Sequence, residues 1–353
     1  MKITVLAPNT AFVHLYSCLP FLFDKDKRFV VTDDWDWVLN NDRSRALILV
    51  RWFQGPPFGD PAVRRDRLER LRQKYEFFAY FDDDDSAASP VLDVLPFVDR
   101  YWKKQLYRDR ALYSRPMRGN RLFTDYYWKT NDFGAAEAPY PELAQPELTS
   151  KMRPAWNLGI GTYPQNHVKE RLSERLFRVG SRLPALLWNR PRRVLTDKQP
   201  QCHARFSPRG YSHSVAFQRS LFLEIVGGTP PFLTGVVDKK TYARELRHVR
   251  AVLSPFGWGE VCFRDFEAIQ NGALLIKPDM THLETFPDVY LPELAVKWDG
   301  SDLKTKVDEV LGLSETEARR LTDAAWEKWD GAWGQLPGRI DTLLDDWLAG
   351  ARS

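Results

Sequence analysis

The chain has 353 residues, which is enough for two domains of about 150 to 180 residues each. No run of eighteen apolar residues occurs, so the sequence predicts no transmembrane helix. The net charge of +4 favours an anionic small ligand or an acidic membrane surface over nucleic acid, and the three widely spaced cysteines show neither a disulfide framework nor a zinc motif.

The first half alternates apolar runs with helix-like segments. Residues 3–7 begin the chain as a buried strand rather than as a signal peptide, which favours a cytoplasmic protein. Residues 46–50 and 77–81 are further apolar runs, and the arginine-rich segment 61–75 between them has a helical pattern. Strands separated by helices predict a parallel α/β sheet.

An acidic run, Asp82 to Asp85, directly follows the third predicted strand. Ligands of open α/β sheets collect at the carboxyl ends of the strands, so Asp83 is a candidate general base for an acceptor hydroxyl. A cluster of carboxylates also suits Mg²⁺ or Mn²⁺, while a solvated acidic turn remains the plain alternative.

Residues 101–110 mix basic and aromatic side chains. The pattern predicts an exposed basic helix with buried aromatic stems. Lys103 and Lys104 are candidates for binding an anionic acceptor or for a peripheral contact with lipid headgroups. Interleaved lysines and aromatics also suit single-stranded nucleic acid, but nothing else in the chain supports that partner.

Periodicity weakens over residues 130–156, and a helix is expected over 169–187. Residues 189–193 have the composition of an interdomain linker. A second α/β unit follows, with strands expected at 203–206 and 232–237 and helices at 214–226 and 242–250.

Residues 253–290 carry the clearest chemical signal. A short apolar strand ends at Pro255, Gly257 and Gly259, and two glycines let the backbone turn sharply and approach a ligand. A helix is expected over 260–271, followed by a buried strand over 273–276. On a helical wheel Glu260, Arg264 and Glu267 share one face.

The sequence Gly257-Trp258-Gly259-Glu260, followed by Glu267-Ala268 and Asn271-Gly272-Ala273, resembles the donor-binding segment of GT-B glycosyltransferases, most closely the group-1 and exostosin-like branches. The group-1 pattern has seven residues between its two glutamates and this chain has six, so Glu267 is the firmer correspondence.

The resemblance implies two Rossmann-like domains facing across a cleft and a metal-independent reaction without a cofactor. It assigns donor contacts to the basic residues of the second half as well as to the motif, namely Arg205, Arg219, Gly257, Trp258, Gly259, Glu260, Arg264 and Glu267. A guanidinium is well shaped for bidentate contact with a diphosphate.

His14 follows the first strand and is a second candidate catalytic base, although a lone histidine is more often structural. The tail is helical: residues 314–317 form a capping-box sequence, and Trp326, Trp329 and Trp333 recur on one face, as is typical of core packing.

We therefore expect an acceptor-binding domain over 1–188, a nucleotide-sugar-binding domain over 189–335, and a helix over 336–353 that packs back on the first domain. The expected function is transfer of a sugar from a nucleotide-sugar to a glycan or glycolipid acceptor in polysaccharide synthesis, in the cytoplasm or at the inner face of the membrane. Two alternatives remain: a metal-dependent GT-A transferase using Asp82 to Asp85, and a non-catalytic nucleotide- or glycan-binding module.

Overall fold

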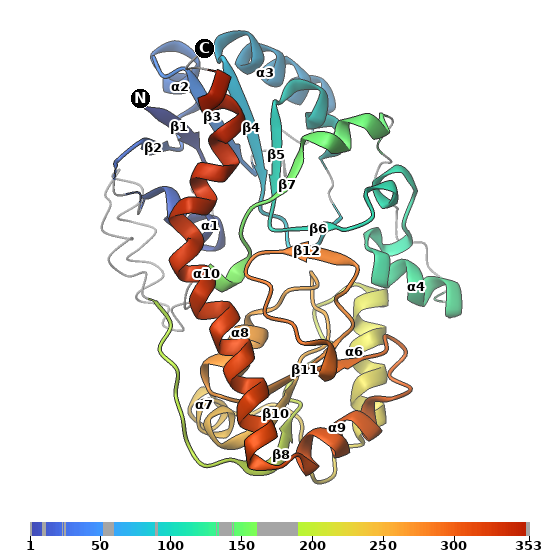
Figure 1. Cartoon of the computed structure of the whole chain (residues 1–353). Helices are drawn as coiled ribbons and strands as arrows, with labels where there is room; N and C mark the ends of the chain where they lie inside the picture. Colours follow the sequence, from blue (N-terminus) through green and yellow to red (C-terminus); the bar gives the residue numbers. More distant parts are fainter. Residues whose placement is uncertain are drawn as a thin grey trace.

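The computed structural model describes residues 2–8, 12–22, 24, 26–51, 60–88, 91–131, 133, 143, 145–160 and 190–350. Figure 1 shows two lobes, with the long helix α10 (Glu315–Gly350) running along both of them. The helix predicted over 169–187 lies outside the described residues. None of the helices in the described part is long and apolar enough to cross a membrane.

The first lobe is built on a parallel sheet in the order β2-β1-β3-β4-β5-β7. Its strands are β1 (Ile3–Leu6), β2 (Phe29–Thr32), β3 (Ala46–Val50), β4 (Phe77–Asp82), β5 (Arg100–Lys103) and β7 (Met152–Pro154). The central strands β1, β3 and β4 are buried along their whole length, as expected for a parallel sheet covered on both faces.

The helices of this lobe are α1 (Phe12–Leu22), α2 (Trp35–Asn40), α3 (Pro61–Lys74) and α4 (Leu122–Thr130). Helix α3 begins where the sequence dictates: Pro61 occupies the first turn, and the Asp60 carboxylate accepts a hydrogen bond from the Ala62 amide. Short 3₁₀ turns cover Leu92–Phe97, Arg110–Ser114, Arg118–Asn120, Pro146–Lys151, Leu158–Ile160 and, in the second lobe, Pro292–Leu294.

The prediction of an exposed basic helix over residues 101–110 is wrong. This segment forms β5 and then β6 (Gln105–Tyr107), and Tyr101, Trp102 and Lys103 are buried. Burial of the aromatic rings on both faces of a strand outweighs the exposure that the basic residues suggested.

The second lobe is built on a parallel sheet in the order β13-β11-β10-β8-β9. Its strands are β8 (Gln199–His203), β9 (Phe232–Leu233), β10 (Val249–Leu253), β11 (Leu274–Pro278) and β13 (Ala295–Val296), and its helices are α6 (His213–Val226), α7 (Lys239–His248), α8 (Phe263–Gln270) and α9 (Leu303–Gly312). The prediction of two Rossmann-like parallel sheets followed by a helical tail is therefore confirmed.

Helix α8 starts three residues later than predicted. The Asp265 carboxylate accepts a hydrogen bond from the Cys262 amide at 2.9 Å and so fixes the first turn after Cys262. Glu260 consequently lies outside the helix, and the shared helical face predicted for Glu260, Arg264 and Glu267 does not form. The strand expected at 203–206 likewise lies at 199–203.

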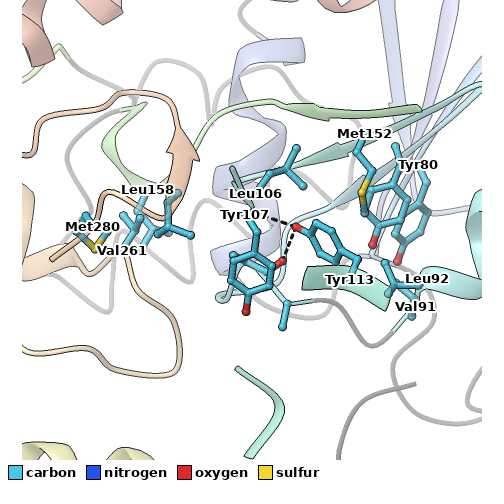
Figure 2. Packing of buried hydrophobic residues seen from close by; sticks show 14 of the residues in the cluster. Tyr80, Val91, Leu92, Leu106, Tyr107, Tyr113, Met152, Leu158, Val261 and Met280 are labelled. Carbon is cyan, nitrogen blue, oxygen red and sulfur yellow. Dashed lines mark hydrogen bonds between the residues drawn. The ribbon is translucent and has the colours of Figure 1, made fainter. Parts of the chain in front are cut away.

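The boundary between the lobes is closed by backbone pairing and by core packing. Strand β6 pairs antiparallel with β12 (Leu283–Thr285) of the second lobe, and the Arg108 amide continues this ladder to the His282 carbonyl at 2.8 Å. Figure 2 shows Leu106 and Leu158 in the same buried cluster as Val261 and Met280 of the second lobe.

Helix α10 contributes to three buried clusters in turn. Ala318 and Leu321 pack in the second lobe, Trp329 packs at the boundary, and Leu344 and Trp347 pack in the first lobe. The capping box is confirmed, because Ser314 and Glu317 bond each other's amides and side chains at the start of the helix.

Candidate functional site

The strand order of each sheet identifies where a ligand can enter. Counted along the chain within each sheet, the strands follow the doubly wound order 2-1-3-4-5, which a sixth strand extends in the first lobe, and the connections change direction between the first and third strands. The reversal falls between β1 and β3 in the first lobe and between β8 and β10 in the second. Ligands of such sheets bind at this point, outside the carboxyl ends of the strands.

In the second lobe, residues predicted to bind the donor collect at this switch point. Arg205 follows β8 by two residues and forms a bidentate pair with Glu245 at 2.7 and 2.8 Å. Arg264, in the first turn of α8, donates to the Arg205 carbonyl and lies over the Tyr242 ring at 5.6 Å. The Arg264 guanidinium is thus hydrogen-bonded to the backbone of Arg205 at one edge of the sheet.

Glu267 belongs to the same group. Its carboxylate accepts a hydrogen bond from the Tyr242 hydroxyl at 2.9 Å, one turn of α8 beyond Arg264. Glu267 is only partly buried, so it keeps access to a ligand above this edge of the sheet.

His203 lies beneath these residues at the end of β8. Its side chain is fully buried, with Nε2 3.6 Å from the Glu245 carboxylate and the ring 4.9 Å from Tyr242. Burial, and then the positive charges of Arg264 and Arg205, lower the pKa of His203 to about 3. His203 is therefore a neutral support for the two arginines at physiological pH.

Arg219, on α6, ties the loops that follow β8 and β10 to each other. Its guanidinium donates to the Ser207 carbonyl at 2.6 Å and to the Phe256 carbonyl at 2.8 Å, and it lies 4.6 Å from the Tyr211 ring. Tyr211 in turn packs 5.2 Å from Trp258, whose side chain remains 47% exposed. Trp258, which stands between the two glycines of the turn, therefore presents an exposed aromatic ring.

Helix α6 begins in the loop after β8 without a side-chain cap. Ser212 stands at the capping position, yet it makes no capping hydrogen bond, and its Oγ is buried without a partner among the described residues. The amide groups of this first turn, together with the helix dipole, form an anion-binding end.

The glycine turn itself contacts the first lobe. A Cβ on Gly259 would overlap the Asp85 carbonyl group and lie 3.0 Å from the Ser86 nitrogen, so only glycine fits this approach. Gly257 has ordinary space, with its nearest neighbours Cys262 and Tyr211 at 3.6 Å.

Glu260 fastens this contact. Its carboxylate is fully buried and accepts hydrogen bonds from the Ser86 hydroxyl at 3.0 Å and the Ala87 amide at 2.9 Å. The Arg121 guanidinium of the first lobe also donates to the Trp258 carbonyl at 2.6 Å. In this structure Glu260 serves the boundary between the lobes, with both of its oxygens engaged there.

In the acidic run on the first lobe, two aspartates are buried in ion pairs and one is partly exposed. Asp82 is buried and accepts hydrogen bonds from Lys103 at 2.9 Å and Tyr101 at 2.6 Å. Asp83 is also buried, 3.4 Å from Arg51. Asp84 is partly exposed and also lies 3.4 Å from Arg51, and burial followed by the charge of Asp82 raises its pKa.

Lys103 and Lys104 are both buried, and neither stands free on the surface. Lys103 is committed to Asp82, and Lys104 lies 3.6 Å from the Asp85 carboxylate. Both lysines therefore neutralise the acidic run in this structure. His14 lies in α1, after β1, but its side chain is outside what the structure describes.

Among the described residues, no three side chains of histidine, cysteine, aspartate or glutamate are placed together so that they could hold a metal ion. Within the acidic run, Lys103 and Arg51 supply the positive charge around Asp82 and Asp83.

A cavity of about 360 Å³ lies at the carboxyl ends of β11 and β13, beside α10. Its lining includes Lys277, Asp279, Tyr290 and Lys328, and none of the residues predicted to bind the donor. Lys277 is committed to Asp265 at 3.0 Å, so the cavity borders α8 on the side away from Glu267.

Sequence reasoning missed Arg51, Ser212 and Tyr242. Arg51 could be recognised only from the structure, where it follows β3 and has a positive φ of 43°. Ser212, directly before a helical pattern, was detectable as a capping residue. Tyr242 could not be found, because its partner Glu267 lies 25 positions further along the chain.

These features define an α/β protein of two Rossmann-like domains whose carboxyl edges meet, as in the GT-B arrangement. No protein family model matches the chain, and no curated protein sequence matches it. Solved structures similar to this chain include two that align with it over most of its length.

The first is the N-terminal domain of the Candida albicans trehalose-6-phosphate phosphatase, with 13% identity, coverage of 98% of this chain and 96% of that one, and a TM-score of 0.41. The second is an α,α-trehalose-phosphate synthase (UDP-forming) from Burkholderia vietnamiensis, with 11% identity, coverage of 87% and 73%, and a TM-score of 0.43. Similarity at this level says nothing about what the present chain binds.

Proposed function

We infer that the protein is a glycosyltransferase that moves a sugar from a nucleotide-sugar donor to a hydroxyl group of a glycan or glycolipid acceptor. One observation supports this above the others. The turn that follows β10 and the acidic run that follows β4 meet at the boundary between the lobes, through Gly259, Glu260 and Ser86. The predicted donor-binding turn therefore lies next to the acidic run, which carries the carboxylates that are candidates for the general base.

In this proposal the donor diphosphate lies at the uncapped first turn of α6, near Arg205 and Arg264. The acceptor oxygen attacks the anomeric carbon while the bond from that carbon to the diphosphate oxygen breaks. Negative charge then grows on the leaving diphosphate, and fixed guanidinium and amide groups stabilise it without reorganisation. Glu267, oriented by Tyr242, accepts hydrogen bonds from donor hydroxyls.

The acceptor proton passes to a carboxylate of the acidic run. Asp83 is the residue that the sequence favours, but in the structure it is buried, and Arg51 lies 3.4 Å from its carboxylate and 3.4 Å from that of Asp84. Asp84 is partly exposed and has a raised pKa, as a general base requires. We propose that Asp84, the more exposed of the two, takes the proton and that the buried Asp83 helps to hold Arg51; loss of activity in Asp83→Asn with full activity in Asp84→Asn would reverse these roles.

Thermal denaturation with a panel of nucleoside diphosphates and sugar nucleotides tests the donor site. A ligand at a hundredfold excess over its Kd adds about 2.7 kcal/mol, which corresponds to a rise in Tm of about 3 to 4 °C for a chain of this size. Arg264→Gln and Glu267→Gln should abolish this rise, whereas Glu224→Gln, an exposed change near the far end of α6, should preserve it. A wild-type protein that responds to none of these ligands contradicts the proposal.

The two alternatives have separate tests. Transfer that survives EDTA excludes the metal-dependent reaction at Asp82 to Asp85. Release of free sugar or of a transfer product from any donor excludes a purely binding module.

A further inference from the structure

A second cavity, of about 300 Å³, lies at the opposite edge of the second sheet. It is formed by the segment that leads into β8, the amino ends of β10 and β11, and the first turns of α10. The proposed donor site lies at the carboxyl ends of the same strands, so the sheet separates the two places. Its volume is at the lower end of the range of small-molecule sites in proteins.

The lining of this cavity is rich in cations. Four basic residues contribute to it, Arg193, Lys198, Arg250 and Arg319, against the two carboxylates of Glu315 and Asp323.

Both carboxylates are already engaged. Asp323 accepts from Arg193 at 2.5 Å, and Glu315 pairs with Arg250. Among the described residues, Lys198 and Arg319 therefore have no carboxylate partner.

Lys198 shows that positive charge is concentrated here. Its ammonium group is partly buried and, within the described part of the chain, donates only to backbone carbonyls, those of Arg247 at 2.8 Å and of Asn271. Burial, and then the charge of Arg193, lower the pKa of Lys198 to about 8. An anion beside this group would reverse the second effect.

Two of the lining residues have unused hydrogen-bond donors. The Arg193 Nε is buried without a hydrogen-bond partner in the part of the chain that the structure describes. An ammonium group has three donors, and Lys198 uses two of them on carbonyls. Glu315, whose side chain is 82% exposed, can swing aside and leave Arg250 to an incoming anion.

We propose that this cavity binds a small phosphate monoester, at a site separate from the donor site. A phosphate dianion matches the surplus of two positive charges and the planar donor sets of the arginines. The proposal does not depend on the identity of the reaction.

The walls of the cavity connect it to the rest of the molecule. Arg193 and Thr196 belong to the segment that enters the second sheet, and Arg319 and Asp323 belong to α10, whose other end packs in the first lobe. A ligand in the cavity would therefore bridge two elements of the second lobe, the segment that enters the sheet and the first turns of α10.

Calorimetric titration with glycerol 3-phosphate and with inorganic phosphate tests the proposal, with glycerol as the uncharged control. The wild-type protein should bind glycerol 3-phosphate saturably, and Arg319→Gln should weaken binding about tenfold, as expected for the loss of one charged contact. Lys198→Met should do the same, whereas Arg320→Gln, an exposed neighbour on α10 outside the cavity, should bind normally.

Binding of inorganic phosphate equal to that of glycerol 3-phosphate would identify a site for the free ion and overturn the monoester assignment. Binding that persists in Arg319→Gln but disappears in Arg264→Gln would place the phosphate at the donor site and overturn the proposal. Absence of saturable binding to the folded wild-type protein would overturn it as well. Because Arg319 is exposed, its variant should fold even where Lys198→Met does not.

Discussion

Replacement of Gly259 by alanine probes the contact between the lobes most directly. The added Cβ would overlap the Asp85 carbonyl group and lie 3.0 Å from the Ser86 nitrogen, which are backbone atoms that cannot rotate away. The two backbones must therefore separate. Overpacking of this kind costs about 1 to 3 kcal/mol.

Separation also weakens the two hydrogen bonds that the buried Glu260 carboxylate accepts from Ser86 and Ala87. Hydrogen bonds to charged groups are worth about 1.5 to 3 kcal/mol each, and partial loss adds to the steric cost. We expect a total destabilisation of about 2 to 4 kcal/mol. For 353 residues the entropy of unfolding is roughly 0.7 kcal/mol per kelvin, so Tm should fall by about 3 to 6 °C.

Differential scanning calorimetry provides the measurement, and the other glycine of the same turn, Gly257, provides the control. Gly257→Ala meets its nearest atoms at 3.6 Å, an ordinary contact, and should change Tm by less than about 1 °C. Equal Tm values for Gly259→Ala and Gly257→Ala would refute the reasoning, because the two variants differ in their contact with the first lobe.

Three further outcomes follow from the same structure. His203, faced by Arg264, Arg205, Glu245 and Tyr242, has a folded pKa of about 3, below its ordinary 6.5, so only the unfolded chain binds a proton between these values. Unfolding free energy should therefore fall by up to about 1.4 kcal/mol per pH unit as pH decreases from 6.5, and urea titrations of His203→Asn should lack this contribution. Tyr242→Phe removes the hydrogen bond to Glu267 and should weaken donor binding about three- to tenfold in calorimetric titration, with no change if Glu267 does not contact the donor. Trp347→Ala removes a buried ring stacked 5.5 Å from Phe77 and should cost about 3 to 5 kcal/mol, whereas a comparable loss in the exposed Asp345→Ala would argue against a packing role.

The sequence predicted the sheets better than it predicted the site. Continuous apolar runs such as 46–50 and 273–276 identify buried parallel strands, because a strand covered on both faces has no polar side. The capping box at Ser314 was also predicted correctly, because its residues lie next to each other in the sequence.

Contacts between distant segments had no such signal. The pattern around Glu260 predicted a helical face, but its oxygens bond to Ser86 and Ala87, more than 170 positions earlier in the chain. The lysines of residues 101–110 suggested exposure, yet Asp82 neutralises Lys103 inside the lobe. Pairings of this kind depend on tertiary structure, which periodicity does not encode.

Helix α10 has a consequence for how the protein unfolds. Its residues belong to the cores of both lobes and of their boundary, so unfolding of either lobe strips apolar partners from the other (Figure 1). Two domains joined in this way lose their independence as folding units. The molecule should melt in a single calorimetric transition, and a fragment that ends before residue 315 should leave apolar surface exposed on both sheets and aggregate.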